Sequence, residues 1–223
     1  MSLVVGRLVV LVGPAGAGKT TLAHRLIDAA VGLRVFSVSH TTRQKREAEV
    51  DGVDYNFVSR VEFEHMIDAA AFVEWAEVHG NLYGTSHVAI ASHLQAGRDV
   101  LFDVDIEGAT HLYAAYPVQT RLVFITPPTW RALCERLERR GTETEATLRR
   151  RLRTARSELA SVLAQIDAGV RWDLLCNDAL AEATTAFELL LAAPTAVYDV
   201  AEERRLAELL ADARADRRAD AID

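Results

Sequence analysis

The chain has 223 residues, half of them hydrophobic, and its 25 basic and 32 acidic side chains give a net charge of −7. This length is sufficient for one good core, or for a core with inserted subdomains. The acidic balance argues against a general nucleic-acid or anionic-membrane surface, which would require excess positive charge. We therefore expect no nucleic acid or membrane partner, and any anion site must be local.

The sequence contains few features that indicate the cellular compartment of the protein. The two cysteines, Cys134 and Cys176, have no CxxC spacing and no neighbouring histidine cluster, which is typical of free, buried thiols in a reducing compartment. The apolar run near the start is broken by Arg7 and is followed by Gly and Lys rather than by a small-residue cleavage site. No run reaches the roughly 18 apolar residues that a membrane span needs. The sequence predicts a cytoplasmic protein.

Short apolar runs alternate with stretches of helical period along the chain. The runs expected to be strands are residues 8–12, 35–38, 100–104, 122–125 and 174–176. Such alternation predicts βαβ units and a mostly parallel sheet covered on both faces, which is an α/β fold.

The stretch GPAGAGKTT, residues 13–21, follows the first expected strand and precedes a helical stretch. It satisfies G-x-x-x-x-G-K-[ST] in the context that this phosphate-binding motif requires. The glycines let backbone N–H groups point at phosphate oxygens, and the helix adds its positive N-terminus. Lys19 would reach the β and γ phosphates of ATP or GTP, and the Thr20 hydroxyl would ligate Mg²⁺. The expected nucleotide-binding residues are Gly13, Gly16, Ala17, Gly18, Lys19, Thr20 and Thr21.

Two segments interrupt the strand–helix alternation. Within residues 39–96, expected strands at 55–58 and 72–78 flank a short helix that begins with the capping-box pair Ser59 and Glu62, which indicates an inserted subdomain. Residues 129–166 read as two helices broken at RGTETE, with eight arginines between Arg136 and Arg156. Taken alone, those arginines favour a solvated helix face.

A local basic cluster lies at the start of the inserted segment. Arg43 and Arg46, with Lys45 between them, could hold one phosphate together with the hydroxyls of Ser39 and Tyr55. A solvated basic loop is the alternative, and the cluster alone favours it.

Two aspartates, Asp103 and Asp105, stand at the end of the expected strand 100–104. A nucleotide-binding loop is usually accompanied by such a residue, which helps to hold the magnesium shell. A helix cap is the alternative role for an aspartate in this position.

The C-terminal segment predicts one more helix over residues 197–218. Leu206, Leu209, Leu210 and Ala213 fall on one side of it, and Pro194 is expected to end the helix before it. We expect the apolar side to pack on the core or on a second subunit.

The motifs taken together resemble the guanylate kinase family over about residues 8–191. They are SVSHTTR, Arg46, Glu49, DGVDYNFVS, FVEWAEVHGNLYGTS, DVDIEGA, the prolines at 127 and 128, RLERRGTETE and CND at 176–178. The resemblance implies a P-loop parallel-sheet core (1–38, 97–128 and 167–193), an inserted mixed β/α GMP-binding subdomain (39–96) and a helical lid (129–166). Together these make a domain of residues 1–193, followed by a helical extension, 194–223. The implied reaction is ATP plus GMP giving ADP plus GDP with Mg²⁺, with dGMP as a further candidate acceptor.

The resemblance also implies roles for individual residues. It places Ser39, Arg43, Arg46, Tyr55 and Tyr83 on the GMP phosphate, Glu74 and Thr85 on guanine, and Glu49, Asp103 and Asp105 among the substrate-binding residues. It assigns catalysis to Lys19 and to the arginines Arg136, Arg140 and Arg151, which would close over the transferring group. It puts Asn177 near the adenine, and Thr20 with Asp103 on the magnesium ion.

Glu74 has an independent chemical rationale. Guanine presents N1–H and an N2 amine side by side, which one carboxylate can accept together, whereas adenine presents an acceptor there. Without the resemblance, Glu74 would more often be on the solvent face of a strand.

Departures from the family and competing functions bear on the same site. Lys45 and Ala48 replace the Pro and Gly of the family pattern T-T-R-x-P-R-x-G-E. An inactive interaction module is disfavoured, because the chain keeps Lys19, Thr20, Asp103 and the lid arginines. A kinase for another phosphorylated acceptor, such as a ribose phosphate, is disfavoured by Glu74 and Thr85, because such an acceptor has no guanine edge for them to bind. A homo-oligomer remains open.

Overall fold

The computed structural model describes residues 6–47, 49–78, 80–139, 145–193, 196 and 199–219. The chain divides into two compact units, the first being Met1–Val9, Ala30–Phe102 and Thr110–Thr120, and the second Val10–Ala29, Asp103–Ala109 and Arg121–Asp223. The predicted insertion therefore belongs to the first unit, while the phosphate loop, the predicted lid and the C-terminal extension belong to the second. Among the described residues, no helix has the length and apolar character needed to cross a membrane.

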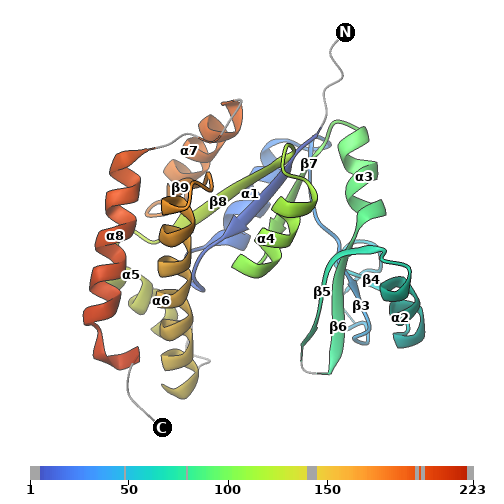
Figure 1. The fold of residues 1–223 in the computed structure, drawn as a ribbon, viewed down its shortest axis with the longest axis horizontal. Coiled ribbons are helices and arrows are strands. Elements are labelled where there is room, and N and C mark those ends of the chain that lie inside the picture. Colours follow the sequence, from blue (N-terminus) through green and yellow to red (C-terminus); the bar gives the residue numbers. More distant parts are fainter. Residues whose placement is uncertain are drawn as a thin grey trace. The chain divides into compact units, whose positions relative to one another are not determined.

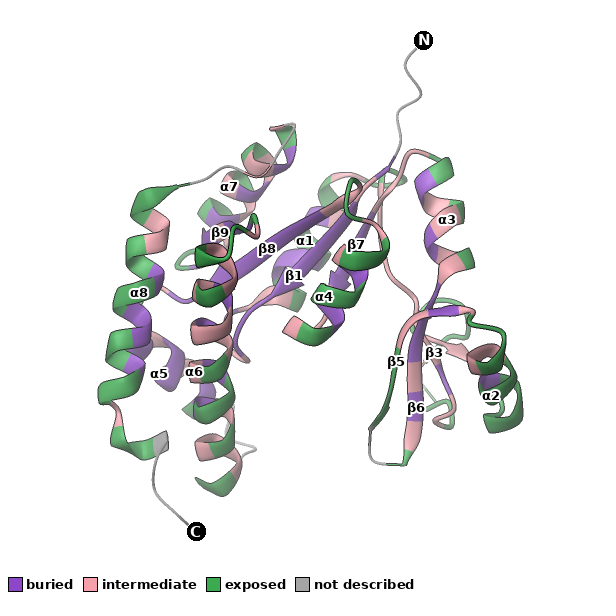
Figure 2. Ribbon diagram, viewed as in Figure 1, coloured by how far each residue is buried: buried purple, intermediate pink, exposed green. Residues whose placement is uncertain are grey.

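The core sheet has the strand order β2-β7-β1-β8-β9. Its strands are β1 (Leu8–Val12), β2 (Arg34–Phe36), β7 (Asp99–Asp103), β8 (Thr120–Thr126) and β9 (Asp173–Cys176) (Figure 1). The pairs β2–β7 and β8–β9 are parallel, as expected. The continuous apolar run of β1 is completely buried, which is the pattern of a strand covered on both faces (Figure 2).

The helices of the second unit match the predicted segments. They are α1 (Lys19–Ala29), α5 (Trp130–Glu138), α6 (Glu145–Asp167), α7 (Leu180–Ala192), α8 (Val200–Ala215) and the 3₁₀ turn η1 (Arg217–Ala219). Helix α5 ends at Glu138 and α6 begins at Glu145, and residues 140–144 of the expected break at RGTETE lie outside the described residues. Helix α4 (Ile106–Ala115) is shared by the two units, and α3 (His87–Gln95) belongs to the first. Pro194, predicted to end a helix, lies outside the described residues.

The apolar side of the predicted C-terminal helix is buried. Leu206, Leu209, Leu210 and Ala213 of α8 are at most 6% exposed. Helix α8 packs against α6, α5 and β9 of its own unit. This confirms the expectation that the extension packs on the chain's own core.

The first unit contains a mixed sheet of order β4-β3-β6-β5. Its strands are β3 (His40–Thr41), β4 (Asn56–Phe57), β5 (Phe72–Val78) and β6 (Asn81–Ser86). β3 pairs parallel with β4 and antiparallel with β6, and β5 and β6 are antiparallel. The sequence predicted β5 and, to within two residues, β4, but not β3 or β6.

Helix α2 (Arg60–Asp68) and this sheet enclose a small core of their own. Ser59 and Glu62 form the predicted capping box. The rings of Phe63 and Phe72 stack with centroids 4.4 Å apart, and Leu82 packs with them. A side chain at Gly84 would approach both rings to 3.0 Å, so β6 needs a glycine where the aromatic rings cross it.

His40 should make the stability of the protein depend on pH. Its Nδ1 is buried without a hydrogen-bond partner, its ring packs against Phe72, and burial lowers its pKa. The unfolded state therefore binds more protons below about pH 6.5, and stability falls as pH drops from there through the lowered folded pKa. Urea unfolding at pH 7.5 and 5.5 should show a smaller pH-dependent loss in His40→Asn than in the parent. Equal losses would contradict this expectation.

Candidate functional site

The phosphate loop lies between β1 and α1, as the motif predicts. Gly16 and Gly18 both have φ of +89°, which side chains rarely adopt. A Cβ at Gly18 would also lie 2.4 Å from Nδ2 of Asn177. Ala17 is buried, and Thr21 is exposed on the first turn of α1. The loop therefore has the backbone freedom that a phosphate cradle requires.

Asn177 supports this loop directly. Its buried side chain donates from Nδ2 to the carbonyl oxygen of Ala17 over 2.7 Å. Removing the amide would leave that carbonyl unpaired within the loop. A contact between Asn177 and adenine stays a prediction.

Lys19, Thr20 and Asp103 converge at the end of the loop. The Lys19 ammonium donates to the carbonyl of Gly13 over 2.6 Å and lies 3.7 Å from the Asp103 carboxylate. The Thr20 hydroxyl donates to the other oxygen of Asp103 over 2.5 Å. The predicted P-loop cation and the two predicted magnesium ligands are thus in mutual contact.

The donor atoms around Thr20 suit magnesium rather than a fully protein-ligated metal. A hydroxyl and a carboxylate are hard oxygen donors, and Mg²⁺ usually keeps waters and phosphate oxygens alongside one or two such groups. Over the described ranges, no group of three or more His, Cys, Asp or Glu side chains could hold a metal by itself. The residues therefore fit an ion that arrives with a nucleotide.

Asp105 has a structural contact as well as a predicted substrate role. One of its carboxylate oxygens accepts from the backbone N–H of Gly108 over 2.8 Å, at the start of α4. This is the helix-cap geometry that the sequence left open as the alternative. Binding of substrate by Asp105 stays a prediction.

A cavity of about 330 Å³ opens beside Lys19 and the two aspartates. From α6 it is lined by Arg150, Arg151, Thr154 and Glu158. Of the three predicted lid arginines, Arg151 lies in this cavity, and Arg136 donates instead to the carbonyl of Asp178 over 3.2 Å. Arg140 lies outside the described residues.

Glu158 is a residue of this cavity that the sequence did not reveal. Its Oε2 is buried without a hydrogen-bond partner. Burial raises its pKa, the positive charge of Lys19 opposes that shift, and the negative charge of Asp105 reinforces it. The spacing of seven from Arg151, which places both residues on one face of a helix, was the available signal.

The arginine cluster of the first unit is organised by Glu49. One carboxylate oxygen accepts from the Arg43 guanidinium over 2.6 Å, and the other accepts from the backbone N–H of Arg46 over 2.7 Å. These two hydrogen bonds, in that order, lower the pKa of Glu49. The hydrogen bond to Glu49 likewise raises the pKa of Arg43. The cluster is therefore a built loop rather than a set of independent solvated charges.

Lys45 closes the same loop. Its ammonium donates to the backbone carbonyl of Glu49 over 2.8 Å. This contact restrains the segment in which Lys45 replaces the family proline. Ala48, the other departure from the family pattern, lies outside the described residues.

Aromatic side chains hold Arg43 from the side of the sheet. Its guanidinium carbon lies 5.4 Å from the ring centroid of Tyr55 and 5.7 Å from that of Phe57. The rings of Tyr55 and Tyr83 meet edge to face at 5.9 Å. The structure thus brings three of the predicted phosphate-binding side chains together, namely those of Arg43, Tyr55 and Tyr83.

Strand β5 has an irregularity next to Glu74. In the β5–β6 ladder Phe72 pairs with Ser86, but Glu74 pairs with Thr85, so Val73 is an extra residue in the manner of a β-bulge. The Thr85 hydroxyl donates to Glu74 Oε1 over 2.8 Å, and the Ser39 hydroxyl lies 3.5 Å from that of Thr85. The two predicted guanine-reading residues are therefore in contact, next to Ser39.

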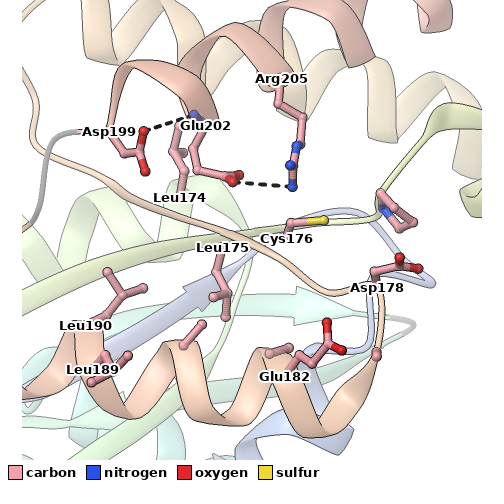
Figure 3. A pocket seen from close by; sticks show the side chains of 14 residues that line it. Leu174, Leu175, Cys176, Asp178, Glu182, Leu189, Leu190, Asp199, Glu202 and Arg205 are labelled. Atoms are coloured by element: carbon pink, nitrogen blue, oxygen red, sulfur yellow. Dashed lines mark hydrogen bonds and ion pairs between the residues drawn. The ribbon is translucent and has the colours of Figure 1, made fainter.

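A second and larger cavity, of about 690 Å³, lies between β9, α7 and α8 (Figure 3). Arg205 reaches from α8 toward the Cys176 thiol and pairs with Glu202 over 3.3 Å. Burial raises the pKa of Cys176, and Arg205 partly offsets the shift. None of the residues predicted from the sequence as site residues lines this cavity.

Known proteins resemble this chain in sequence and in fold. The sequence model described as "Guanylate kinase" matches residues 5–193. The guanylate kinase of Anaeromyxobacter dehalogenans (strain 2CP-C) is 47% identical over 170 residues, which are 76% of this chain and 75% of the relative. That of Nocardia farcinica (strain IFM 10152) is 51% identical over 158 residues, 70% and 81% of the two chains. The crystal structure of guanylate kinase from Anaplasma phagocytophilum matches with a TM-score of 0.61 and 28% identity, covering 93% of this chain and 95% of the other. Because the likeness in sequence and in fold extends over most of its length, the chain belongs to the guanylate kinase family.

Proposed function

We propose that this guanylate kinase, which phosphorylates GMP to GDP, takes the phosphoryl group from ATP bound with Mg²⁺. The observation that carries the proposal is the contact of Lys19, Thr20 and Asp103 at a glycine-rich loop before α1. Loop N–H groups and the helix N-terminus suit a polyphosphate, and the two oxygen donors suit its magnesium ion. When bound, Mg²⁺ would neutralise charge on the β and γ phosphates.

The acceptor residues have complementary tasks. Arg43 and Arg46 would bind the phosphate of GMP through forked, charge-assisted hydrogen bonds, with Ser39, Tyr55 and Tyr83 as hydroxyl donors. Glu49 would keep Arg43 in place through its 2.6 Å contact. Holding the acceptor phosphate in line with the donor is the main catalytic requirement, because the acceptor is already an anion.

Guanine selection is assigned to Glu74 and Thr85. Since Thr85 donates to Oε1 of Glu74, the second carboxylate oxygen can accept from the N1 and N2 groups of guanine. Adenine would place an acceptor against that carboxylate, and the unmet desolvation would oppose its binding. Because this recognition does not involve the 2′-hydroxyl, dGMP is a second candidate acceptor.

Arginines of the predicted lid are assigned to the transferring group. Arg151 lines the cavity next to Lys19, and Arg136 is held near the phosphate loop through Asp178. Their charges would offset the negative charge that develops on the phosphoryl oxygens. Arg140 is assigned the same role from its position in the sequence. We also propose that residues 1–193 divide into a core (1–38, 97–128 and 167–193), an insertion (39–96) and a lid (129–166). We further propose that the protein acts in the cytoplasm and that it can associate as a homo-oligomer.

A coupled assay of ADP formation tests the proposal. GMP, dGMP, AMP, UMP and CMP are each offered with ATP and MgCl₂, and GMP is repeated with EDTA in excess of magnesium. We expect turnover with GMP, weaker turnover with dGMP, little with the other nucleotides and none with EDTA. Equal rates with AMP and GMP would contradict the guanine assignment, and magnesium-independent turnover would contradict the donor assignment.

Glu74→Gln should raise the KM for GMP by about 10- to 100-fold and leave the KM for ATP unchanged. The amide still accepts one hydrogen bond but adds a donor where guanine also donates, and a hydrogen bond to a charged group is worth about 1.5–3 kcal/mol. Glu77→Gln is the matched control, because Glu77 is exposed on the same strand and pairs only loosely with Arg60, at 3.7 Å. If steady-state kinetics give both variants the parental KM for GMP, Glu74 does not read the base.

A further inference from the structure

We propose that the segment after the family domain, residues 199–219, positions the nucleotide-binding loop through α5, and that Asp216 and Arg218 are its positioning residues. The family match ends at residue 193, so no family role covers this segment. The inference rests on the proposed function, in which the phosphate loop and Arg136 bind ATP.

Asp216 ties the end of α8 to the beginning of α5. Its Oδ2 accepts from the indole Nε1 of Trp130 over 2.8 Å. Trp130 is only 4% exposed and is the first residue of α5, so this hydrogen bond links the first turn of the helix to the end of α8. The pKa of Asp216 lies well below its usual range, first because of hydrogen bonds from Arg218 and then because of the one from Trp130.

Arg218 extends the same contact along α5. It donates to Asp216 over 2.7 Å, to the Cys134 sulfur over 3.0 Å and to Glu138 over 3.1 Å. Cys134 lies one turn after Trp130, and Glu138 is the last residue of the helix. Asp216 and Arg218 together therefore contact α5 at its start, its middle and its end.

The phosphate loop lies against other side chains of the same helix. A Cβ built on Gly16 would meet Leu133 and Leu137 of α5 at 3.3 Å. Both leucines are fully buried or nearly so. Arg136, between them in sequence, donates to the carbonyl of Asp178, the residue after the loop-supporting Asn177. A shift of α5 would thus move both the wall of the loop and Arg136.

Helix α8 is itself held by its packing on neighbouring elements, so it can keep α5 in position. Its buried side packs against α5 and α6, which lie beside it in Figure 1. Near its start, Arg205 reaches Cys176 of β9, next to Asn177 (Figure 3). Helix α8 therefore contacts two elements that lie next to the phosphate loop, α5 and β9.

A positioning role differs from a purely structural one in what it predicts. The Arg218 side chain is half exposed, and ion pairs of that kind contribute little to global stability. Binding geometry is more sensitive, because small displacements of oriented groups have large effects on a bound phosphate. Loss of the contact should weaken ATP-site binding more than it lowers the melting temperature.

The test measures ADP affinity in the full-length protein without turnover, by equilibrium titration with a fluorescent ADP analogue at 20 °C. Asp216→Ala and Arg218→Gln should each weaken ADP binding by about three- to tenfold, and GMP affinity, measured by calorimetry, should stay parental. Asp212→Ala and Arg217→Gln are the matched controls, because these residues are exposed close by in the same segment. Neither control should change ADP affinity.

A conservative variant distinguishes the loss of this hydrogen bond from misfolding of the protein. Trp130→Phe keeps an aromatic ring in the core while it removes the Nε1 donor together with part of the side-chain volume, so it should weaken ADP binding in the same way. Combined with Asp216→Ala, it should cost less than the sum of the two single changes. Parental ADP affinity in all three single variants would overturn the inference, as would a parallel loss of ADP affinity, GMP affinity and melting temperature. Absence of ADP binding by the parent protein would contradict the proposed function itself.

Discussion

Lys19→Ala is expected to lower kcat for GMP phosphorylation by about 10²- to 10³-fold or more while the protein stays folded. Electrostatic groups aimed at developing charge contribute effects of that size in other enzymes. The ammonium of Lys19 contacts the Gly13 carbonyl and the Asp103 carboxylate, so its charge lies at the loop to which we assign the donor phosphates. Steady-state rates with saturating ATP and GMP measure the effect, and circular dichroism checks the fold.

Lys45→Ala is the matched control for this experiment, since Lys45 is the other lysine of the chain. It contacts the backbone carbonyl of Glu49 within the first unit. Its kcat should stay within a few-fold of the parent. A Lys19→Ala enzyme of similar activity would show that the loop is not the donor site.

Arg43→Ala should reduce kcat/KM for GMP by about two orders of magnitude or more, chiefly through binding of the acceptor phosphate. The substitution removes a forked cation and also leaves the Glu49 carboxylate without its 2.6 Å ion-pair partner. Both changes oppose binding of an anion. Kinetics with varied GMP at low and high salt measure the effect.

Lys45→Pro is the informative comparison in the same loop. Proline restores the family residue and its fixed φ, while the hydrogen bond to the Glu49 carbonyl is lost. The two effects act on the same restraint in opposite directions, so the change in kcat/KM should stay below about fivefold. If this variant is as damaging as Arg43→Ala, the loop does not hold GMP in the way the family resemblance implies.

Local signals in the sequence were sufficient for much of the architecture. Strand β1 was bounded correctly because five apolar residues precede a glycine-rich turn, and the start of α2 was placed correctly because Ser59 and Glu62 form a complete cap. The buried side of α8 followed from the period of its apolar residues. These features depend on residues within one or two turns of each other.

The features that the sequence did not reveal depend on distant partners. Strands β3 and β6 are short or contain a glycine, and they exist because they pair with each other and pack on Phe63 and Phe72. The contact between Asn177 and Ala17 joins residues 160 positions apart. Glu158 resembles any other charged residue of α6 until the cavity around Lys19 is known. The roles of individual site residues are assigned from the family resemblance, and the experiments described above test them.

The position of α8 also bears on the outer edge of the core sheet. β9 is the last strand in the order of the core sheet, and its outer side has no strand partner among the described residues. Unpaired N–H and C=O groups on such an edge can template strand addition from another molecule. Helix α8 packs against β9, and its Arg205 places a charged group beside Cys176. The extension therefore lies against the last strand of the core sheet, where its bulk and charge would oppose strand addition from another molecule.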